Sequence, residues 1–296
     1  MRFHWDWMKP VMPVPYVPTL GPVHPACHPA DLFEAAADIA GTGRFLPYDK
    51  GRRWSTSKAE RILTGDIQHT PHQTFIPTLT ETGTGTGTVK VHVYGTQPDS
   101  LSAGADLARK LTTTHGTANA RIVWFLGPEQ PEQYAAGVGT RVQLKDFTTT
   151  PSSEPRPHAV VRPYDDQPDT VKASFADFAE NMKADGFAFL HEQMQAGAVG
   201  PVLTIAHDGQ VAGAIGPMET ITDPTGATQL LPQYFGVTPE HRGHGYGRAL
   251  WRAAMNWGRE HGAAYQILQT EVGGASDRLC QAEGLTSLGF VCSRAA

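Results

Sequence analysis

The chain has 296 residues, of which 40% are hydrophobic and 18% charged, a composition typical of a folded protein large enough for two cores. Lysine and arginine together number 24 against 29 acidic residues, so a broad basic surface for nucleic acid is not expected. No stretch predicts a membrane-spanning helix, and the three cysteines show no paired spacing that would indicate a disulfide framework.

Residues 1–30 are rich in proline and contain Trp5, Trp7 and Tyr16. Proline disfavours both helix interiors and central strands, so we expect an extended arm whose aromatic rings pack against a domain. The arm lacks the uninterrupted apolar core of a signal peptide, which predicts a cytoplasmic protein. His24, Cys27 and His28 are potential metal ligands, and the nearby second cluster that a metal site would need is His69 with His72, but histidines of a proline-rich loop without a metal are expected.

The periodicity of residues 31–150 predicts a first α/β domain. Predicted helices are 31–39, 55–63, 101–111 and 131–136, and predicted strands are 73–79, 89–94, 121–126 and 140–147. A Thr/Gly repeat at 82–88 is expected to form a loop. The polar, proline-rich segment 151–157 predicts a linker.

Residues 158–296 are predicted to form a second α/β domain. Its predicted strands are 158–163, 202–207, 211–218, 229–237, 265–272 and 290–292, and its first predicted helices are 170–183 and 187–195. The turn Asp208-Gly209 between two alternating segments indicates a hairpin.

The stretch from Gln233 to Trp251 runs from a strand through a glycine-rich turn into an amphipathic helix. The first amides of a helix lack intrahelical partners and lie at the positive end of its dipole, so they favour a phosphate. Glycines in the turn let the backbone approach the anion, and Arg242 adds a charge-assisted contact. Neither the Rossmann nor the P-loop spacing is present, which indicates a different nucleotide-type ligand.

The motif Val237-x-Pro239-x-x-Arg242-Gly243-x-Gly245-x-Gly247-x-x-Leu250 resembles the acyl-CoA-binding motif of the GCN5-related N-acetyltransferase (GNAT) superfamily. The resemblance covers residues 158–296 and implies the mixed-sheet α/β fold of that superfamily. It also implies that the strand before the turn splays from its neighbour and pairs with pantetheine, while the turn amides hold the pyrophosphate. The residues implied to bind acetyl-CoA, or another acyl-CoA, are Phe235, Gly236, Val237, Arg242, Gly243, His244, Gly245, Tyr246, Gly247 and Arg248.

The first half shows the same order of strand, turn, helix, strand, helix and strand as the second half. This order suggests a tandem protein whose N-terminal domain is a degenerate GNAT-like copy. Residues 95–102 would then replace the pyrophosphate turn, without its glycine spacing or its arginine. The alternative is an unrelated α+β domain.

Acyl transfer to an amine requires a base for the amine proton. Glu271 at a strand end is our first candidate, with Glu219 and His207 as alternatives, and Tyr234 is a candidate for lining the acceptor pocket. A solvated carboxylate or a core ring would explain each of these residues equally well.

Many GNAT enzymes protonate the departing thiolate with a tyrosine shortly before a Leu-Gly-Phe sequence. Counting back from Leu288-Gly289-Phe290 places Leu285 at that position, so the usual acid is absent. Alternative donors nearby are Ser276, Cys280, Thr286 and Ser287, besides water. Cys280 is also a candidate nucleophile for a two-step route, although a buried helix cysteine is the commoner case.

Together these features predict the transfer of an acetyl group from acetyl-CoA to a primary amine of a small-molecule metabolite, by direct attack in a ternary complex. We expect a monomer or a homodimer, and neither nucleic acid nor a membrane as partner. Two alternatives stay open. One is an acyltransferase that uses another acyl-CoA, a carrier-protein thioester or an aminoacyl-tRNA, and the other is a catalytically inactive CoA-binding sensor or structural protein.

Overall fold

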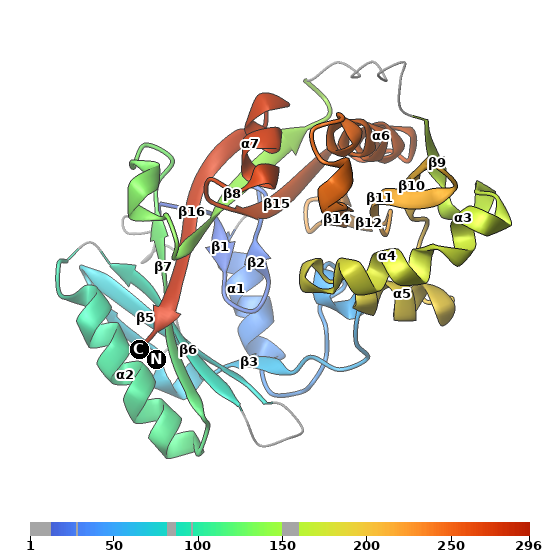
Figure 1. Cartoon of the computed structure of the whole chain (residues 1–296). Coiled ribbons are helices and arrows are strands. Elements are labelled where there is room, and N and C mark those ends of the chain that lie inside the picture. Colours follow the sequence, from blue (N-terminus) through green and yellow to red (C-terminus); the bar gives the residue numbers. More distant parts are fainter. Residues whose placement is uncertain (1–12, 28, 82–86, 96, 150–159) are drawn as a thin grey trace. The chain divides into compact units, whose positions relative to one another are not determined.

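The computed structural model describes residues 13–27, 29–81, 87–95, 97–149 and 160–296 (Figure 1). The chain forms two compact units, one of Met1–Lys145 with Ile267–Ala296 and the other of Asp146–Gln266. We call them the N-terminal unit and the central unit. The predicted linker and most of the predicted Thr/Gly loop lie outside the described residues.

The N-terminal unit is built on a mixed sheet. Its helices are α1 (Pro29–Asp38), α2 (Ser100–His115) and α7 (Ala275–Ala282). Its strands are β1 (Tyr16–Val17), β2 (Gly21–Pro22), β3 (Glu60–Ile62), β4 (Gln68–Thr70), β5 (Gln73–Thr80), β6 (Thr88–Gly95), β7 (Asn119–Leu126), β8 (Gly139–Asp146) and β16 (Thr286–Ala295), with most of β15 (Tyr265–Glu271). The strand order is β8-β16-β7-β6-β5-β3, and β4 pairs with β5. Helix α2 connects the parallel pair β6 and β7.

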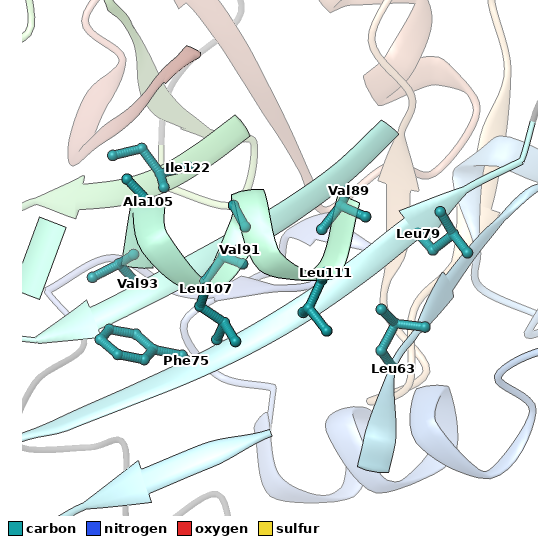
Figure 2. Close-up of a cluster of buried hydrophobic side chains, with 11 residues drawn as sticks. Leu63, Phe75, Leu79, Val89, Val91, Val93, Ala105, Leu107, Leu111 and Ile122 are labelled. Atoms are coloured by element: carbon teal, nitrogen blue, oxygen red, sulfur yellow. The ribbon is translucent and has the colours of Figure 1, made fainter. Parts of the chain in front are cut away.

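One face of this sheet is covered by α2, as Figure 1 shows. The buried side chains between the helix and the strands form one apolar cluster, shown in Figure 2. They are Leu63, Phe75, Leu79, Val89, Val91, Val93, Ala105, Leu107, Ala108, Leu111 and Ile122. Gly104 allows the close approach of the helix, because a Cβ there would lie only 2.6 Å from Val93 Cγ2. Removal of this apolar surface from water is the main force that holds α2 on the sheet.

The C-terminal segment is fixed to the N-terminal unit by a buried carboxylate on α7. Asp277 is fully buried, and its Oδ1 accepts hydrogen bonds from Arg141 Nε at 2.9 Å and Gln143 Nε2 at 3.1 Å. Thr270 Oγ1 and the N–H of Gly273 donate to the same carboxylate at 3.0 and 2.9 Å. A buried charge is tolerated only when it is paired and hydrogen-bonded, and these partners come from β8, from β15 and from the turn that follows β15.

The central unit contains α3 (Asp169–Ala173), α4 (Phe175–Asn181), α5 (Phe187–Gln195) and α6 (Tyr246–Glu260). Its strands are β9 (Val161–Pro163), β10 (Leu203–His207), β11 (Gln210–Gly216), β12 (Thr220–Thr222), β13 (Thr228–Leu230), β14 (Tyr234–Val237) and the start of β15. Strands β14-β11-β10-β9 form an antiparallel sheet, while β13 pairs with β12 and runs parallel to β15. Phenylalanines and aliphatic residues of α3, α4 and α5 form a core with β11.

Most predicted elements are confirmed within a few residues, including the hairpin of β10 and β11, whose turn residues Asp208 and Gly209 both have positive φ. The predicted helix at 55–63 is wrong. Glu60, Arg61 and Ile62 instead pair with β5, because the ladder outweighs local helix propensity.

Three further differences concern element boundaries. The predicted strand 229–237 is two strands, because Pro232 between them has no N–H to donate to a ladder. The predicted helix 170–183 is interrupted at Ser174, between α3 and α4. The last strand is much longer than the predicted 290–292, because β16 pairs with both β7 and β8. This pairing groups residues 267–296 with the N-terminal unit, whereas the domain boundaries at 31, 150 and 158 stay predictions.

Tyr16 of the predicted arm packs its ring 5.0 Å from that of Phe125, as expected for an arm held by aromatic contacts. Trp5 and Trp7 lie outside the described residues. Among the helices that the structure describes, none has the length and apolar character that crossing a membrane requires.

We predict that Asp277→Ala lowers the free energy of unfolding by about 3–5 kcal/mol, because it leaves the buried Arg141 guanidinium with the exposed Glu132 as its one carboxylate partner among the described residues. Urea unfolding followed by tryptophan fluorescence measures the loss. The matched control is Asp106→Ala, which removes an exposed partner of Arg109 and should cost less than about 1 kcal/mol. Equal costs for the two variants would contradict a structural role for Asp277.

Candidate functional site

Strand β14 lies at the edge of its sheet. Its backbone pairs with β11 from Tyr234 opposite Gly216 to Val237 opposite Gly213. The next strand along the chain, β15, belongs to a different sheet. Within the described residues, the second edge of β14 therefore has no strand partner, and its backbone polar groups are available to an extended ligand.

A side chain at the start of β15 contacts the residues just before β14. Gln266 Nε2, at the start of β15, donates to Leu231 O at 3.2 Å and to Gln233 Oε1 at 2.9 Å. Beyond this contact the chain of β14 pairs only with β11. The splayed strand that the sequence motif implies stays a prediction.

The turn after β14 brings unpaired amides to the start of α6. A short 3₁₀ turn, Pro239–His241, follows the strand, and Gly243 and Gly245 then adopt φ values of 84° and 82°. Side chains with a Cβ rarely adopt this conformation, so these two positions favour glycine. The first N–H that bonds back along the helix is that of Ala249, which donates to Gly245 O at 3.1 Å. The preceding amides at 245–247 have no backbone acceptor in the described structure, and they lie at the positive end of the α6 dipole.

Arg242 is held beside this turn by the strand. Its Nε donates to Val237 O at 3.1 Å, while the residue as a whole stays exposed. The other guanidinium nitrogens thus lie close to the turn, where they suit an anion. Arg248, in the first turn of α6, is half-buried.

Two glycines let β14 pack closely against its neighbours. A Cβ at Gly247 would lie 3.3 Å from Phe235 Cζ, so this glycine brings α6 against the strand. A Cβ at Gly236 would lie 2.7 Å from Met182 Cε and 2.8 Å from Phe187 Cε2. These contacts hold the strand between α6 and the helices that precede β10.

Four rings surround the turn, and we call His207, His241, His244 and Tyr246 the ring cluster. The Tyr246 hydroxyl lies 3.0 Å from His207 Nδ1, and the rings of His207 and His241 are 4.8 Å apart. His244 Nδ1 lies 3.1 Å from Arg242 O, so this nitrogen carries the proton and donates to the carbonyl.

The ring cluster is the part of the site that sequence reasoning missed. The sequence suggests His207 only as a base, whereas the structure places it beside the glycine turn. Part of the cluster could be found in the sequence, because His241 precedes the glycine turn and His244 lies within it, whereas His207 belongs to the distant hairpin of β10 and β11.

The other predicted site residues of the central unit have structural contacts. Glu219 Oε1 accepts a hydrogen bond from the N–H of Gly200 at 3.2 Å. The half-buried ring of Tyr234 lies against Gly186, whose Cβ position would be 2.4 Å from Tyr234 Cε1. Its centroid is 6.3 Å from that of Phe189 on α5. Tyr234 thus packs against the start of α5, and Glu219 holds the loop at Gly200.

The remaining candidates lie in the N-terminal unit. Glu271 is exposed and lines a pocket of that unit together with Lys90 and His92. Burial raises the pKa of the Cys280 thiol to about 12, with nearby Asp277 adding to the effect. Cys280 is therefore protonated at neutral pH and poorly suited to act as a nucleophile. Leu285 is a buried aliphatic residue.

In the N-terminal unit, the region that corresponds to the free edge of β14 and the glycine turn is filled by strand pairing and side chains. Strand β6 has partners on both edges, since it pairs with β5 and with β7 as far as Val93 opposite Trp124. Beyond that pair, the ring of Tyr94 stacks on Phe125 at 4.7 Å. A Cβ at Gly95 would meet Ser100 Oγ at 2.6 Å, so the first residue of α2 fills the turn. The predicted element order holds except that the helix predicted at 131–136 is a short 3₁₀ turn, Glu132–Tyr134, and common ancestry of the two halves stays a prediction.

Comparison with known proteins finds a family match that includes the glycine turn. Residues 167–280 match the acetyltransferase (GNAT) family. No curated protein matches the chain in sequence.

Several solved structures are similar at a distance. One is a GCN5-related N-acetyltransferase from Sphaerobacter thermophilus, with 11% identity, a TM-score of 0.43, and coverage of 76% of this chain and 80% of that chain. A tandem GNAT protein from the clavulanic acid biosynthesis pathway has 15% identity, a TM-score of 0.43, and coverage of 76% and 79%. A GNAT-family acetyltransferase from Colwellia psychrerythraea has 12% identity, a TM-score of 0.46, and coverage of 90% and 94%. Similarity at this level is too distant to assign the role of any residue.

The family match contains β14, the glycine turn and α6, the same elements whose geometry leaves a free strand edge and unpaired amides. The mixed-sheet fold and the match agree with the motif in the sequence. Residues 167–280 of this chain are therefore an acetyltransferase domain of the GNAT family.

Proposed function

We propose that the protein binds acetyl-CoA along β14 and the glycine turn and transfers the acetyl group to a primary amine of a small molecule. The observation that carries this proposal is the free edge of β14 leading directly into the unpaired amides at 245–247. The pantetheine arm of CoA carries amide groups along its length and ends at a diphosphate, so it matches the strand edge followed by the turn amides.

The turn fits a diphosphate sterically as well as electrostatically. At Gly243 a Cβ would meet nothing within 4 Å, so the space beside the backbone is open. Arg242 and the amides supply positive charge and donors next to that space. In this proposal Phe235, Gly236 and Val237 pair with pantetheine, and residues 243–248 hold the pyrophosphate.

The thioester of the bound donor supplies an activated carbonyl carbon. A backbone N–H of β14 is suited to stabilise the oxyanion that forms when an amine attacks this carbon. The amine must lose a proton, for which Glu271 is the first candidate and Glu219 the second. Direct attack is favoured over a covalent enzyme intermediate, because the buried Cys280 thiol stays protonated.

One donor per chain is expected. The N-terminal unit offers no free edge on β6, and Tyr94 and Ser100 occupy the positions where a second ligand would need space. This unit therefore serves another purpose than binding acyl-CoA.

A second candidate function is that of a CoA-binding protein without catalysis. The observation that favours it is Leu285, an aliphatic side chain at the position from which a tyrosine would protonate the thiolate. Tight CoA binding without thiol release from acetyl-CoA, across a panel of primary amines, would support this candidate and contradict the enzyme.

We predict that Gly245→Asp abolishes CoA binding in isothermal titration calorimetry, because it places a carboxylate against the diphosphate. Aspartate tolerates the positive φ of 82° with a cost on the order of 1 kcal/mol, so the fold should persist. The matched control is Gly262→Asp, a glycine with φ of 76° and open space near the other end of α6. Unchanged CoA affinity in Gly245→Asp would remove the basis of the proposed donor site.

We predict that Glu271→Gln lowers the rate of thiol release at saturating acetyl-CoA by roughly a hundredfold or more, which is the usual contribution of a general base. Glu219→Gln should lower it less, since that side chain is engaged with Gly200. Glu260→Gln, an exposed residue at the end of α6, is the control. The reverse order of the two effects would assign the base to Glu219.

A further inference from the structure

The N-terminal unit has a pocket of about 440 Å³ on a sheet whose other face is covered by α2. It is lined by side chains from β6, β7, β8, β15 and β16 and by Tyr16 of the arm. Of the residues named in the proposed acyl transfer, only Glu271 lines this pocket.

Two cations meet at one end of the pocket. Lys90 on β6 and Arg121 on β7 are direct partners in the parallel ladder, and both line the pocket. Lys90 has a carboxylate partner, Glu60, at 3.1 Å. Arg121 donates to the Ser293 hydroxyl at 3.2 and 3.1 Å and has no carboxylate partner among the described residues. Like charges on neighbouring strands repel, so an anion between them would be stabilising.

A buried histidine lies beside these cations. His92 follows Lys90 by two residues on β6, lines the same pocket and is only 2% exposed. Its Nδ1 lies 3.1 Å from Ile76 O, and because a carbonyl only accepts, Nδ1 carries the proton. Burial lowers the pKa of His92 to about 4, so the ring is neutral at pH 7. Its Nε2 is then an acceptor without a hydrogen-bond partner in the described structure.

The opposite end of the pocket is anionic. Glu271 and Gln269 of β15 line it, and Gln269 Nε2 donates to Thr140 Oγ1 at 2.9 Å. The order β15-β8-β16-β7 puts Glu271 three strand spacings from Arg121, and the register offsets them by three residues along the strands, which together make roughly 17 Å between backbones. The two side chains reduce this gap to a length that a small aliphatic molecule spans, since extended lysine measures roughly 8 Å from carboxylate to amine.

We propose that this pocket binds a small molecule about as long as lysine, with an anionic group held by Lys90 and Arg121 and a primary amine held by Glu271. A second N–H or O–H group of the ligand donates to His92 Nε2. The inference stands on the pocket and does not depend on the proposed acyl transfer.

The test uses three probes that differ by one group. L-Lysine carries the carboxylate, the α-amine and the distal amine, whereas L-norleucine lacks the distal amine and cadaverine lacks the carboxylate. Calorimetry on the full chain should show L-lysine binding roughly tenfold or more tightly than either of the others, because two charge-assisted contacts are made. Nitrogen NMR should show the His92 Nε2 signal shifting with L-lysine and not with cadaverine. Equal affinities for the three probes would overturn the proposal.

Matched variants locate the binding. Arg121→Gln and Glu271→Gln should each weaken L-lysine binding roughly tenfold or more. The controls are Arg109→Gln, on the exposed side of α2, and Glu129→Gln, in an exposed loop. All four positions are exposed, so circular dichroism should show a retained fold. Loss of affinity in the controls equal to that in the pocket variants would also overturn the proposal.

Two roles of such a ligand can be distinguished when acetyl-CoA is present. Mass spectrometry that finds acetylated lysine identifies the pocket ligand as an acceptor. Unchanged lysine that alters the rate of thiol release with another amine identifies it as an effector. Either result supports the pocket, and the calorimetry decides whether the pocket binds such a ligand at all.

Discussion

The unpaired edge of β14 is the constraint on which the candidate donor site depends. A strand with one open edge exposes hydrogen-bonding groups that must be satisfied by water or by a ligand. Here the open edge is kept between two close contacts, since Gly236 brings the strand against Met182 and Phe187, and Gly247 brings α6 against Phe235. The strand is thereby held in place without a ladder on that side, and its end leads into amides that also lack partners.

In the N-terminal unit, a similar order of elements leaves no free strand edge on β6. Strand β6 has β5 and β7 on its edges, and Tyr94 stacked on Phe125 takes up the space beyond the ladder. Helix α2 then packs on one face with an apolar cluster rather than presenting a glycine turn. The pocket on this sheet combines cations, a neutral imidazole and a carboxylate, which gives this unit a binding surface of different chemistry.

The fold was predictable where the chemistry is local. The glycine turn, its positive-φ positions and the following helix follow from residues adjacent in sequence, as does the hairpin before them. Non-local pairing was not predictable. Glu60 to Ile62 form a strand because β5 is there to pair with, and β16 extends far beyond its apolar centre because two strands flank it. The ring cluster and the Asp277 network were missed for the same reason, since their members come together only in the folded chain.

Hydrogen exchange of the backbone amides tests the central claim most directly, because it reports on the free strand edge and the turn themselves. With saturating CoA, amides along β14 and at residues 243–248 should exchange at least roughly tenfold more slowly, while those of β6 should not change. Protection of β6 and α2 with unaltered exchange in β14 and the turn would contradict the account. It would place the donor in the unit whose strand β6 is already paired on both edges.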